Sequence, residues 1–276
     1  MTALDHIRDD VAALPLWDGK PTFEPLPGGI SNLSFVATDR AGKYVVRLTR
    51  DFPFHNVYRE REVAVARAAH AAGFAPEVVH AEPGLMVSRF IDARPLKPED
   101  ARANIGRIVE LLLRFHRQMA APIGDYAFDV FEVNRGYIAA LGADEWTELN
   151  ERLAAMQVAL APVFAHHDLL AGNILDDGTR LWLIDFEYSG PGSPMFDLAN
   201  LSSNAQFTAD DRAALLRAYF GSEEHARAHR AMEAASLLRE ALWSLVSARH
   251  IHERDVDYVA YADKNFARLR EVVRDL

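Results

Sequence analysis

The distribution of apolar and polar residues predicts a strand-rich first third of the chain. Short apolar runs in this region alternate with turn signals such as Pro27-Gly28-Gly29 and Pro83-Gly84, a pattern typical of antiparallel strands. Strands are expected at 33–37, 44–48, 77–80 and 85–90. The segment 57–72 is instead rich in Ala, Arg and Glu and stops at Gly73, so it is predicted to be a helix.

The rest of the chain mainly follows a helical period. Apolar residues recur at intervals of three and four, as on the buried side of a helix, at Ile105, Ile108, Leu112, Phe115 and Met119. Further helices are predicted at 223–247 and 255–274. The segment 164–185 departs from this period. It predicts strand, loop, strand, turn and strand, with Asp177-Gly178 as the turn of a hairpin.

These elements predict an α+β fold with two lobes. Residues 1–92 are expected to form a small antiparallel β-rich lobe with one helix. Residues 93–276 are expected to form a larger, mainly helical lobe that carries the hairpin. A cleft between two such lobes is a favoured place for a small ligand, so the candidate site is expected there.

Composition and charge exclude several classes of chemistry. Cysteine is absent from the 276 residues, which excludes disulfide scaffolds, thiolate metal sites and a cysteine nucleophile. The formal net charge of -10 disfavours nucleic acid and anionic membranes as partners and suits a cationic one. The chain shows neither a secretory signal at its start nor an apolar run of about 20 residues, so a cytoplasmic location is expected. No pattern predicts an oligomeric state.

Three polar residues of the predicted hairpin indicate a catalytic site. They follow the pattern His166-x-Asp168-x4-Asn173, and then Ile184-Asp185-Phe186. Asn173 enters one strand and Asp185 leaves the other, so their oxygen atoms are expected to converge where Mg²⁺ can bind. This is the arrangement of protein-kinase-like phosphotransferases, with Asp168 as base and Asn173 and Asp185 as metal ligands. The alternative is that these residues only form turns and a helix cap.

The first lobe contains candidate residues for binding ATP. Gly28-Gly29-Ile30-Ser31-Asn32 lies between two predicted strands, and its free backbone N–H groups are suited to phosphates. Arg47 lies on a later strand, and Glu60 or Glu62 on the following helix offers a partner for this cation. The alternatives are an ordinary hairpin turn and a surface charge pair.

Over roughly residues 23–266 the sequence resembles the choline/ethanolamine kinase branch of the aminoglycoside-phosphotransferase-like superfamily. The resemblance is carried by 28–32, by 166–175, and by Leu183-Ile184-Asp185-Phe186-Glu187-Tyr188-Ser189. Protein kinases have Gly after Asp-Phe, whereas choline kinases typically have Glu-Tyr, and they also have arginine on the third strand. The resemblance implies that Glu62 is the partner of Arg47. It further implies that backbone groups from Arg89 to Ile91 hold adenine, and that Asp197 supports the metal loop.

The resemblance also implies an aromatic cage for a quaternary ammonium group, which aromatic faces and nearby carboxylates bind. The matching aromatic residues are Tyr188, Trp243, Tyr258 and Tyr261, and the carboxylates of Asp168 and Glu187 are also expected to contact the acceptor. Where the family often has a second tryptophan, this chain has Glu240, which can pair with a primary amine or add negative charge. The alternative is that these aromatic residues belong to the core.

The function expected from this resemblance is transfer of the γ-phosphate of ATP, with Mg²⁺, to the hydroxyl of choline or ethanolamine. One alternative keeps the chemistry and changes the acceptor to thiamine, an aminoglycoside or another cationic alcohol. The other is a nucleotide-binding pseudokinase, although an inactive relative would not need Asp168, Asn173 and Asp185 together. Four histidines, at 225, 229, 250 and 252, are expected to be solvated on charged helix faces.

Overall fold

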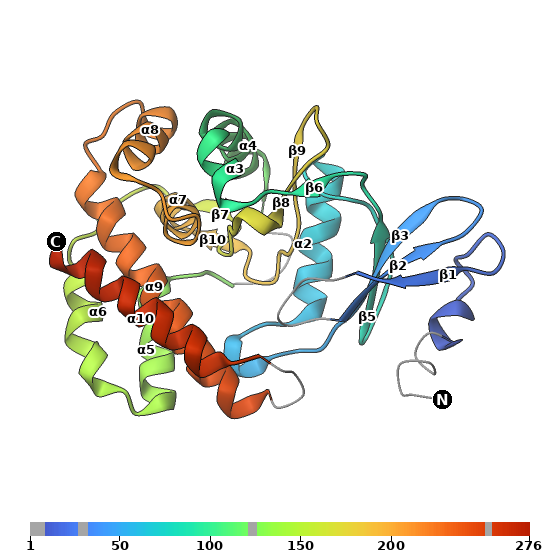
Figure 1. Ribbon diagram of the computed structural model, residues 1–276, viewed down its shortest axis with the longest axis horizontal. Helices are drawn as coiled ribbons and strands as arrows, with labels where there is room; N and C mark the ends of the chain where they lie inside the picture. Colours follow the sequence, from blue (N-terminus) through green and yellow to red (C-terminus); the bar gives the residue numbers. More distant parts are fainter. Residues whose placement is uncertain (1–8, 27–32, 121–125, 252–255) are drawn as a thin grey trace.

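The computed structural model describes residues 9–26, 33–120, 126–251 and 256–276. These residues form a sheet-containing lobe and a helical lobe, at the right and left of Figure 1. The α+β fold predicted from the sequence is therefore confirmed. No described helix has both the length and the apolar character needed to cross a membrane.

The first lobe is built on a five-stranded antiparallel sheet with the order β1-β2-β3-β5-β4. Its strands are β1 (Thr22–Pro25), β2 (Leu33–Thr38), β3 (Lys43–Leu48), β4 (Val78–Glu82) and β5 (Leu85–Arg89). Phe35 faces Val46 in the register, and Val46 faces Val87 on the next strand. All three side chains are buried. The alternating pattern that predicts these strands is therefore the pattern of one covered face.

A short helical turn and one helix connect β3 to β4. These are η1 (Pro53–His55) and α2 (Arg59–Ala71). α2 begins two residues later than the predicted helix because Phe52 and Val57 pair backbone to backbone ahead of it. Val65 and Ala69 of α2 are buried in the same core as Ile108 of the second lobe. The core therefore continues from one lobe into the other.

The second lobe contains eight helices among its described residues. They are α3 (Pro98–Ala103), α4 (Ile105–Gln118), α5 (Val130–Leu141), α6 (Thr147–Ala154), α7 (Pro194–Asn204), α8 (Ala209–Phe220), α9 (Ala226–His250) and α10 (Tyr258–Arg274). α9 packs against α5, α7 and α10, and Figure 1 shows it at the centre of the lobe. The middle of α9 is buried on all sides, so even the charged residues of that part lie in the interior.

Short strands between α6 and α7 form the predicted hairpin and its support. They are β7 (Val163–Ala165), η3 (Ala171–Asn173, a helical turn), β8 (Ile174–Asp176), β9 (Leu181–Leu183) and β10 (Gly190–Gly192). β8 pairs with β9, and β10 pairs with β7. In the connection between the lobes, β6 (Arg94–Pro95) pairs with β8. This pairing attaches the connection between the lobes to the hairpin.

Candidate active site

The loop between β7 and β8 is held in place by one buried carboxylate, Asp197. Its two oxygens accept hydrogen bonds from the backbone N–H groups of His166 at 2.8 Å and His167 at 2.7 Å. His116 Nε2 lies 3.0 Å from the same carboxylate. Burial opposes ionisation, but the hydrogen bond and charge of His116 hold the pKa of Asp197 below its usual range. Asp197 was expected to support the metal loop, and the structure places its contacts at the start of the β7–β8 loop, which carries both Asp168 and Asn173.

Asp168 and Asn173 are in direct contact at the end of this loop. The amide nitrogen of Asn173 donates to the backbone oxygen of Asp168 at 2.8 Å and lies 3.4 Å from its carboxylate. Among the described residues, no hydrogen bond engages Oδ1 of Asn173, so this oxygen is available to a cation. Burial raises the pKa of the Asp168 carboxyl to about 7, with Glu240 and Asp185 adding to the effect and Arg239 opposing it.

Asp185 lies beside this pair, at the exit of β9. The N–H of Ile184 donates to the backbone oxygen of Asn173 at 3.1 Å, which brings the two ends of the hairpin together as the sequence predicts. Asp185 has a φ of 68° and His167 a φ of 62°. Such left-handed conformations are costly outside glycine and are concentrated at functional sites. Asn173 and Asp185 supply the hard oxygen atoms that suit Mg²⁺.

A chain of alternating charges connects Asp185 to the first lobe. Arg47 on β3 contacts Asp185 at 3.2 Å and Glu62 on α2 at 2.7 Å. Arg59 contacts Glu62 at 2.5 Å and Glu187 at 2.8 Å. Burial opposes the charged form of Arg47, but Glu62 and Asp185 raise its pKa above the usual value. The structure thus pairs Arg47 with Glu62, and it adds Arg59, which the sequence analysis did not identify.

Glu187 belongs to this charge network in the structure. It was expected among the residues that contact the acceptor, but its side chain is buried and its Oε2 accepts from Arg59. Burial raises the pKa of Glu187 to about 8, and the negative charge of Asp185 adds to this effect. The contact with Arg59 shows that this carboxylate points toward the start of α2.

Three of the four aromatic residues expected to form a cage, Tyr188, Trp243 and Tyr258, meet in the second lobe. The indole N–H of Trp243 donates to the hydroxyl of Tyr188 at 3.0 Å. Tyr258 approaches the Trp243 ring edge-on, with 6.1 Å between centroids. His55 of η1 stacks on Trp243 at 5.2 Å. Tyr188 and Tyr258 are both buried in the core of this lobe, so the cage and core interpretations overlap.

Glu240 and Tyr261 also lie together, and Arg239 joins them to Asp168. Tyr261 donates its hydroxyl to Glu240 Oε2 at 3.0 Å. Nη1 of Arg239 lies 3.0 Å from Glu240 Oε1 and 3.4 Å from Asp168 Oδ1. The sequence did not indicate a role for Arg239, because an Arg-Glu pair within a long helix is usually exposed to solvent. One sequence feature does point to the site: Arg239 lies four residues before Trp243 and therefore on the same face of the helix.

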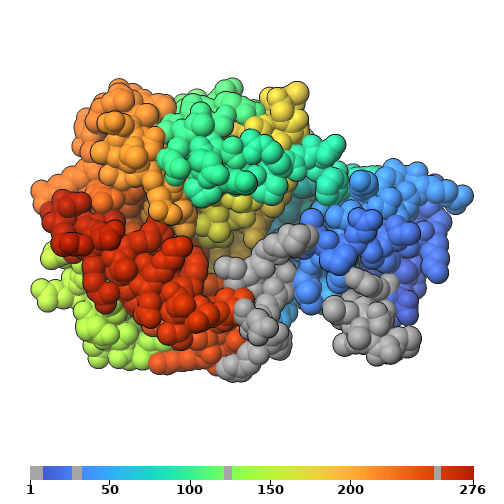
Figure 2. Space-filling view, viewed as in Figure 1, coloured from blue at the N-terminus to red at the C-terminus, as the bar shows by residue number. Residues whose placement is uncertain are grey.

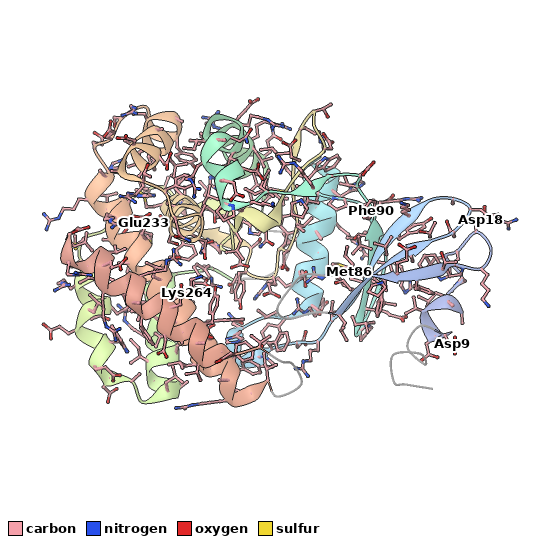
Figure 3. The ribbon with its side chains drawn as sticks, in the orientation of Figure 1. Asp9, Asp18, Met86, Phe90, Glu233 and Lys264 are labelled. Atoms are coloured by element: carbon pink, nitrogen blue, oxygen red, sulfur yellow. The ribbon has the colours of Figure 1, made fainter. Side chains whose placement is uncertain are left out.

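The residues expected to bind the nucleotide are described only in part. Gly28, Gly29, Ser31 and Asn32 lie outside the described residues. The backbone N–H of Arg89 donates to Glu77 at 2.8 Å, so it is used inside the sheet and is not free for adenine. The chain then passes Phe90, labelled in Figure 3, and turns at Ile91, whose carbonyl accepts from Ala93 at 2.8 Å. Ile91 thus remains as the candidate for an adenine contact.

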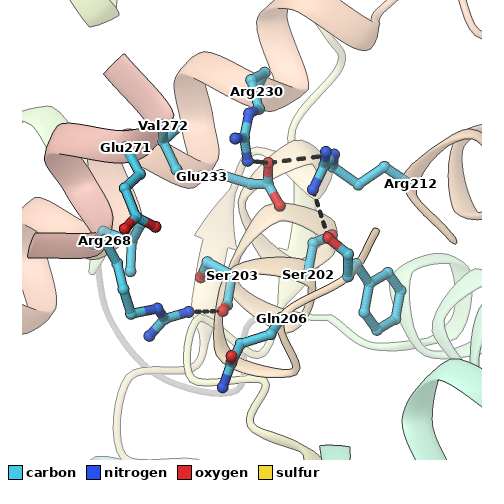
Figure 4. Close-up of a pocket in the computed structure, with 11 residues that line it drawn as sticks. Ser202, Ser203, Gln206, Arg212, Arg230, Glu233, Arg268, Glu271 and Val272 are labelled. Atoms are coloured by element: carbon cyan, nitrogen blue, oxygen red, sulfur yellow. Dashed lines mark hydrogen bonds and ion pairs between the residues drawn. The ribbon is translucent and has the colours of Figure 1, made fainter. Parts of the chain in front are cut away.

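The surface around the loop between β7 and β8 is hollowed. In Figure 2 the yellow atoms of this segment lie recessed between the green α3–α4 region and the red α10. A separate cavity of about 210 Å³ lies between α7, α9 and α10, and none of the expected site residues lines it. In that cavity Glu233 is held by Arg230 at 2.9 Å, while Arg268 donates to the backbone of Ser203 (Figure 4).

Comparison with known proteins agrees with this geometry. The profile described as the Phosphotransferase enzyme family matches residues 22–237. A structure of a choline/ethanolamine kinase family protein from Mesorhizobium loti is 30% identical, with a TM-score of 0.79 over 99% of this chain and 95% of that one. The fold also matches the choline kinase LicA of Streptococcus pneumoniae, at 21% identity and a TM-score of 0.78 over 99% of both chains. A probable ethanolamine kinase of Arabidopsis thaliana is 29% identical over 64% of this chain and 54% of that protein. The chain belongs to the choline/ethanolamine kinase family within the phosphotransferase enzyme family, whose members phosphorylate alcohol hydroxyls.

Proposed function

We propose that this phosphotransferase transfers the γ-phosphate of ATP to the hydroxyl of ethanolamine or choline, with Mg²⁺ as the metal. The observation that carries the proposal is the contact of Asp168 with Asn173 beside Asp185. A base next to two oxygen ligands for a metal is the set of groups that phosphoryl transfer requires. The aromatic and acidic residues near Asp168 are of the types that bind the ammonium group of a cationic alcohol.

The residues of the hairpin and Arg47 have distinct tasks in this proposal. Asp168 orients the acceptor hydroxyl and takes its proton. Asn173 Oδ1 and the Asp185 carboxylate hold Mg²⁺, which when bound neutralises charge on the phosphates. Asn173 also fixes Asp168 through its amide N–H. Arg47, restrained by Glu62 and Asp185, presents a positive charge to the phosphates.

The remaining expected residues complete the two substrate sites. Gly28, Gly29, Ser31 and Asn32 offer backbone N–H groups to the phosphates, and the backbone at Ile91 contacts adenine. Arg89, whose guanidinium lies 4.8 Å from the centre of the Tyr44 ring, borders the adenine site through its side chain. On the acceptor side, Tyr188, Trp243, Tyr258, Tyr261 and Glu240 surround the cationic alcohol, and Glu187, next to Tyr188 in the chain, is held by Arg59.

The test is a measurement of ADP release with Mg-ATP against four acceptors: ethanolamine, choline, thiamine and an aminoglycoside. We expect turnover with at least one of the first two, and none above background with Asp168→Asn. A wild-type protein that releases no more ADP than this variant with all four acceptors would contradict the proposal. Turnover with thiamine or the aminoglycoside alone would keep the chemistry and replace the acceptor.

A further inference from the structure

Arg239 is an arginine in the interior of the candidate acceptor site. It lies within the central helix α9, its side chain is 2% exposed, and it ranks first by volume among the fully buried side chains described. Among the described residues its Nε has no hydrogen-bond partner. A buried guanidinium is tolerated only where nearby groups compensate its charge. The contacts of Arg239 therefore indicate its role.

The guanidinium covers one face of Tyr188. Its central carbon lies 4.4 Å from the centre of the Tyr188 ring, which is the distance of a cation–π contact. The ring of His55 stacks on one face of Trp243, with 5.2 Å between the ring centroids and 22° between the ring planes. One face of Tyr188 and one face of Trp243 are therefore occupied by side chains of the protein itself and are closed to a quaternary ammonium group.

Arg239 also joins the two carboxylates of the site. It lies 3.4 Å from Asp168 and 3.0 Å from Glu240, while the second oxygen of Glu240 accepts from Tyr261. Two carboxylates share one guanidinium, so when both are ionised one negative charge remains for a cation. This charge is carried by oxygen atoms that accept hydrogen bonds, and not by an aromatic face.

Primary and quaternary ammonium groups differ in what they require. A primary ammonium has N–H donors and is bound by oxygen atoms, whereas a quaternary ammonium has none and is bound by aromatic faces. We propose that Arg239 sets the acceptor specificity: by covering Tyr188 and bridging Asp168 and Glu240, it makes the site select a primary ammonium alcohol over a quaternary one. This inference rests on the proposed function.

The test uses a methylation series: ethanolamine, its N-methyl and N,N-dimethyl forms, and choline. We expect kcat/KM of the wild-type protein to fall along the series, by about tenfold or more in total. In Arg239→Gln the covered face of Tyr188 becomes available. The ratio of kcat/KM for choline to kcat/KM for ethanolamine should then rise by about tenfold, which corresponds to the free energy of one desolvated cation–π contact. Arg239→Lys keeps the positive charge but loses the planar guanidinium that stacks on Tyr188. Its ratio should therefore lie between those of the wild-type protein and Arg239→Gln.

Arg249→Gln is the matched control, because Arg249 is an exposed arginine on the same helix; its ratio should equal that of the wild-type protein. If thermal denaturation shows that Arg239→Gln does not fold, the double variant Arg239→Met/Glu240→Gln replaces it, since this variant removes one positive and one negative charge together and so keeps the net charge of the buried cluster. A wild-type preference for choline, or an unchanged ratio in the folded variants, would overturn the inference alone. Absence of turnover with all four alcohols would overturn the proposed function with it.

Discussion

Single residues in this site act mainly by restraining other residues. Asn173 uses its amide N–H to hold Asp168, and Asp197 uses both oxygens to hold the loop ahead of Asp168. Arg47 is restrained in turn by Glu62 and Asp185. A group restrained by hydrogen bonds before the substrate arrives needs little rearrangement during the reaction. The roles of individual carboxylates can therefore be tested by changes that keep their shape.

Asp168→Asn tests the base. Asparagine keeps the size of the side chain but cannot accept a proton, so turnover should fall by on the order of 10²-fold or more. Mg-ATP affinity, measured by calorimetry, and the melting temperature should change little. Asp210→Asn, at an exposed position of α8, is the control and should retain wild-type turnover. Near-normal turnover in Asp168→Asn would refute the assignment.

Asp185→Asn tests the metal ligand. Asp185 has a φ of 68°, a conformation that asparagine tolerates far better than alanine does, so the backbone should keep its geometry. The loss of charge should remove the Mg²⁺ dependence of ATP binding and lower turnover by on the order of 10²-fold or more. Calorimetric titration of ATP with and without Mg²⁺ measures this. Binding that stays equally dependent on Mg²⁺ would show that the metal is held elsewhere.

At the scale of elements, short segments connect the site to the helices around it. η1 contributes His55, whose ring nitrogens lie 2.9 Å from the Tyr137 hydroxyl on α5 and 2.8 Å from Ser247 on α9. The same ring stacks on Trp243. The hairpin is attached to the connection between the lobes through β6. The acceptor side of the site therefore depends on contacts among η1, α5 and α9.

His55→Gln tests this contact through its pH dependence. Burial, together with the charge of Arg239, lowers the pKa of His55 to about 3. Below the unfolded-state pKa of about 6.5 the unfolded chain binds a proton that the folded chain does not, so this histidine reduces stability as the pH falls. Between pH 7 and pH 5 the reduction is about 2 kcal/mol. His55→Gln should be less stable than the wild-type protein at pH 7, and the difference should shrink by that amount at pH 5.

The measurement is urea denaturation of both proteins at the two pH values. Because other titrating groups are common to the two proteins, their contributions cancel in the difference. A difference in unfolding free energy that stays constant from pH 7 to pH 5 would mean that His55 is protonated in the folded protein.

At the scale of the whole molecule, the two lobes share interior residues. Phe115 of α4 packs against Phe74, which follows α2, at 5.4 Å between centroids and against Phe186, beside Asp185, at 6.2 Å. Val65 and Ala69 lie in the same core. The helix that carries Glu62 is therefore fixed to the lobe that carries Asp185. Their separation cannot change without disturbing a packed interior.

Phe115→Ala tests this shared core. Removal of a fully buried phenylalanine should lower the free energy of unfolding by about 3–5 kcal/mol. If the core couples the lobes, urea unfolding should remain one transition, with far-UV circular dichroism and tryptophan fluorescence coinciding. Val259→Ala, at a position that is 55% exposed, should change stability by less than about 0.5 kcal/mol. Two separate transitions in Phe115→Ala would contradict the coupling.

The sequence by itself determined the features that depend on neighbouring residues. Asp168, Asn173 and Asp185 meet because a short hairpin brings together residues that are close along the chain, and hydrophobic period distinguished the strands from the helices. The family resemblance added Glu62 as the partner of Arg47, and the structure has this pair.

Only the tertiary structure decided which charged residues are buried. Arg59 meets Glu187 across 128 residues, and Arg239 meets Asp168 across 71; no local pattern encodes such pairs. His229 was expected to be solvated, but it is 1% exposed and contacts Ser202 at 3.0 Å. The physical reason is common to Arg239 and His229. The middle of α9 is surrounded by other helices, so the polar residues of that part lie in the interior and their partners come from elements far away in the sequence.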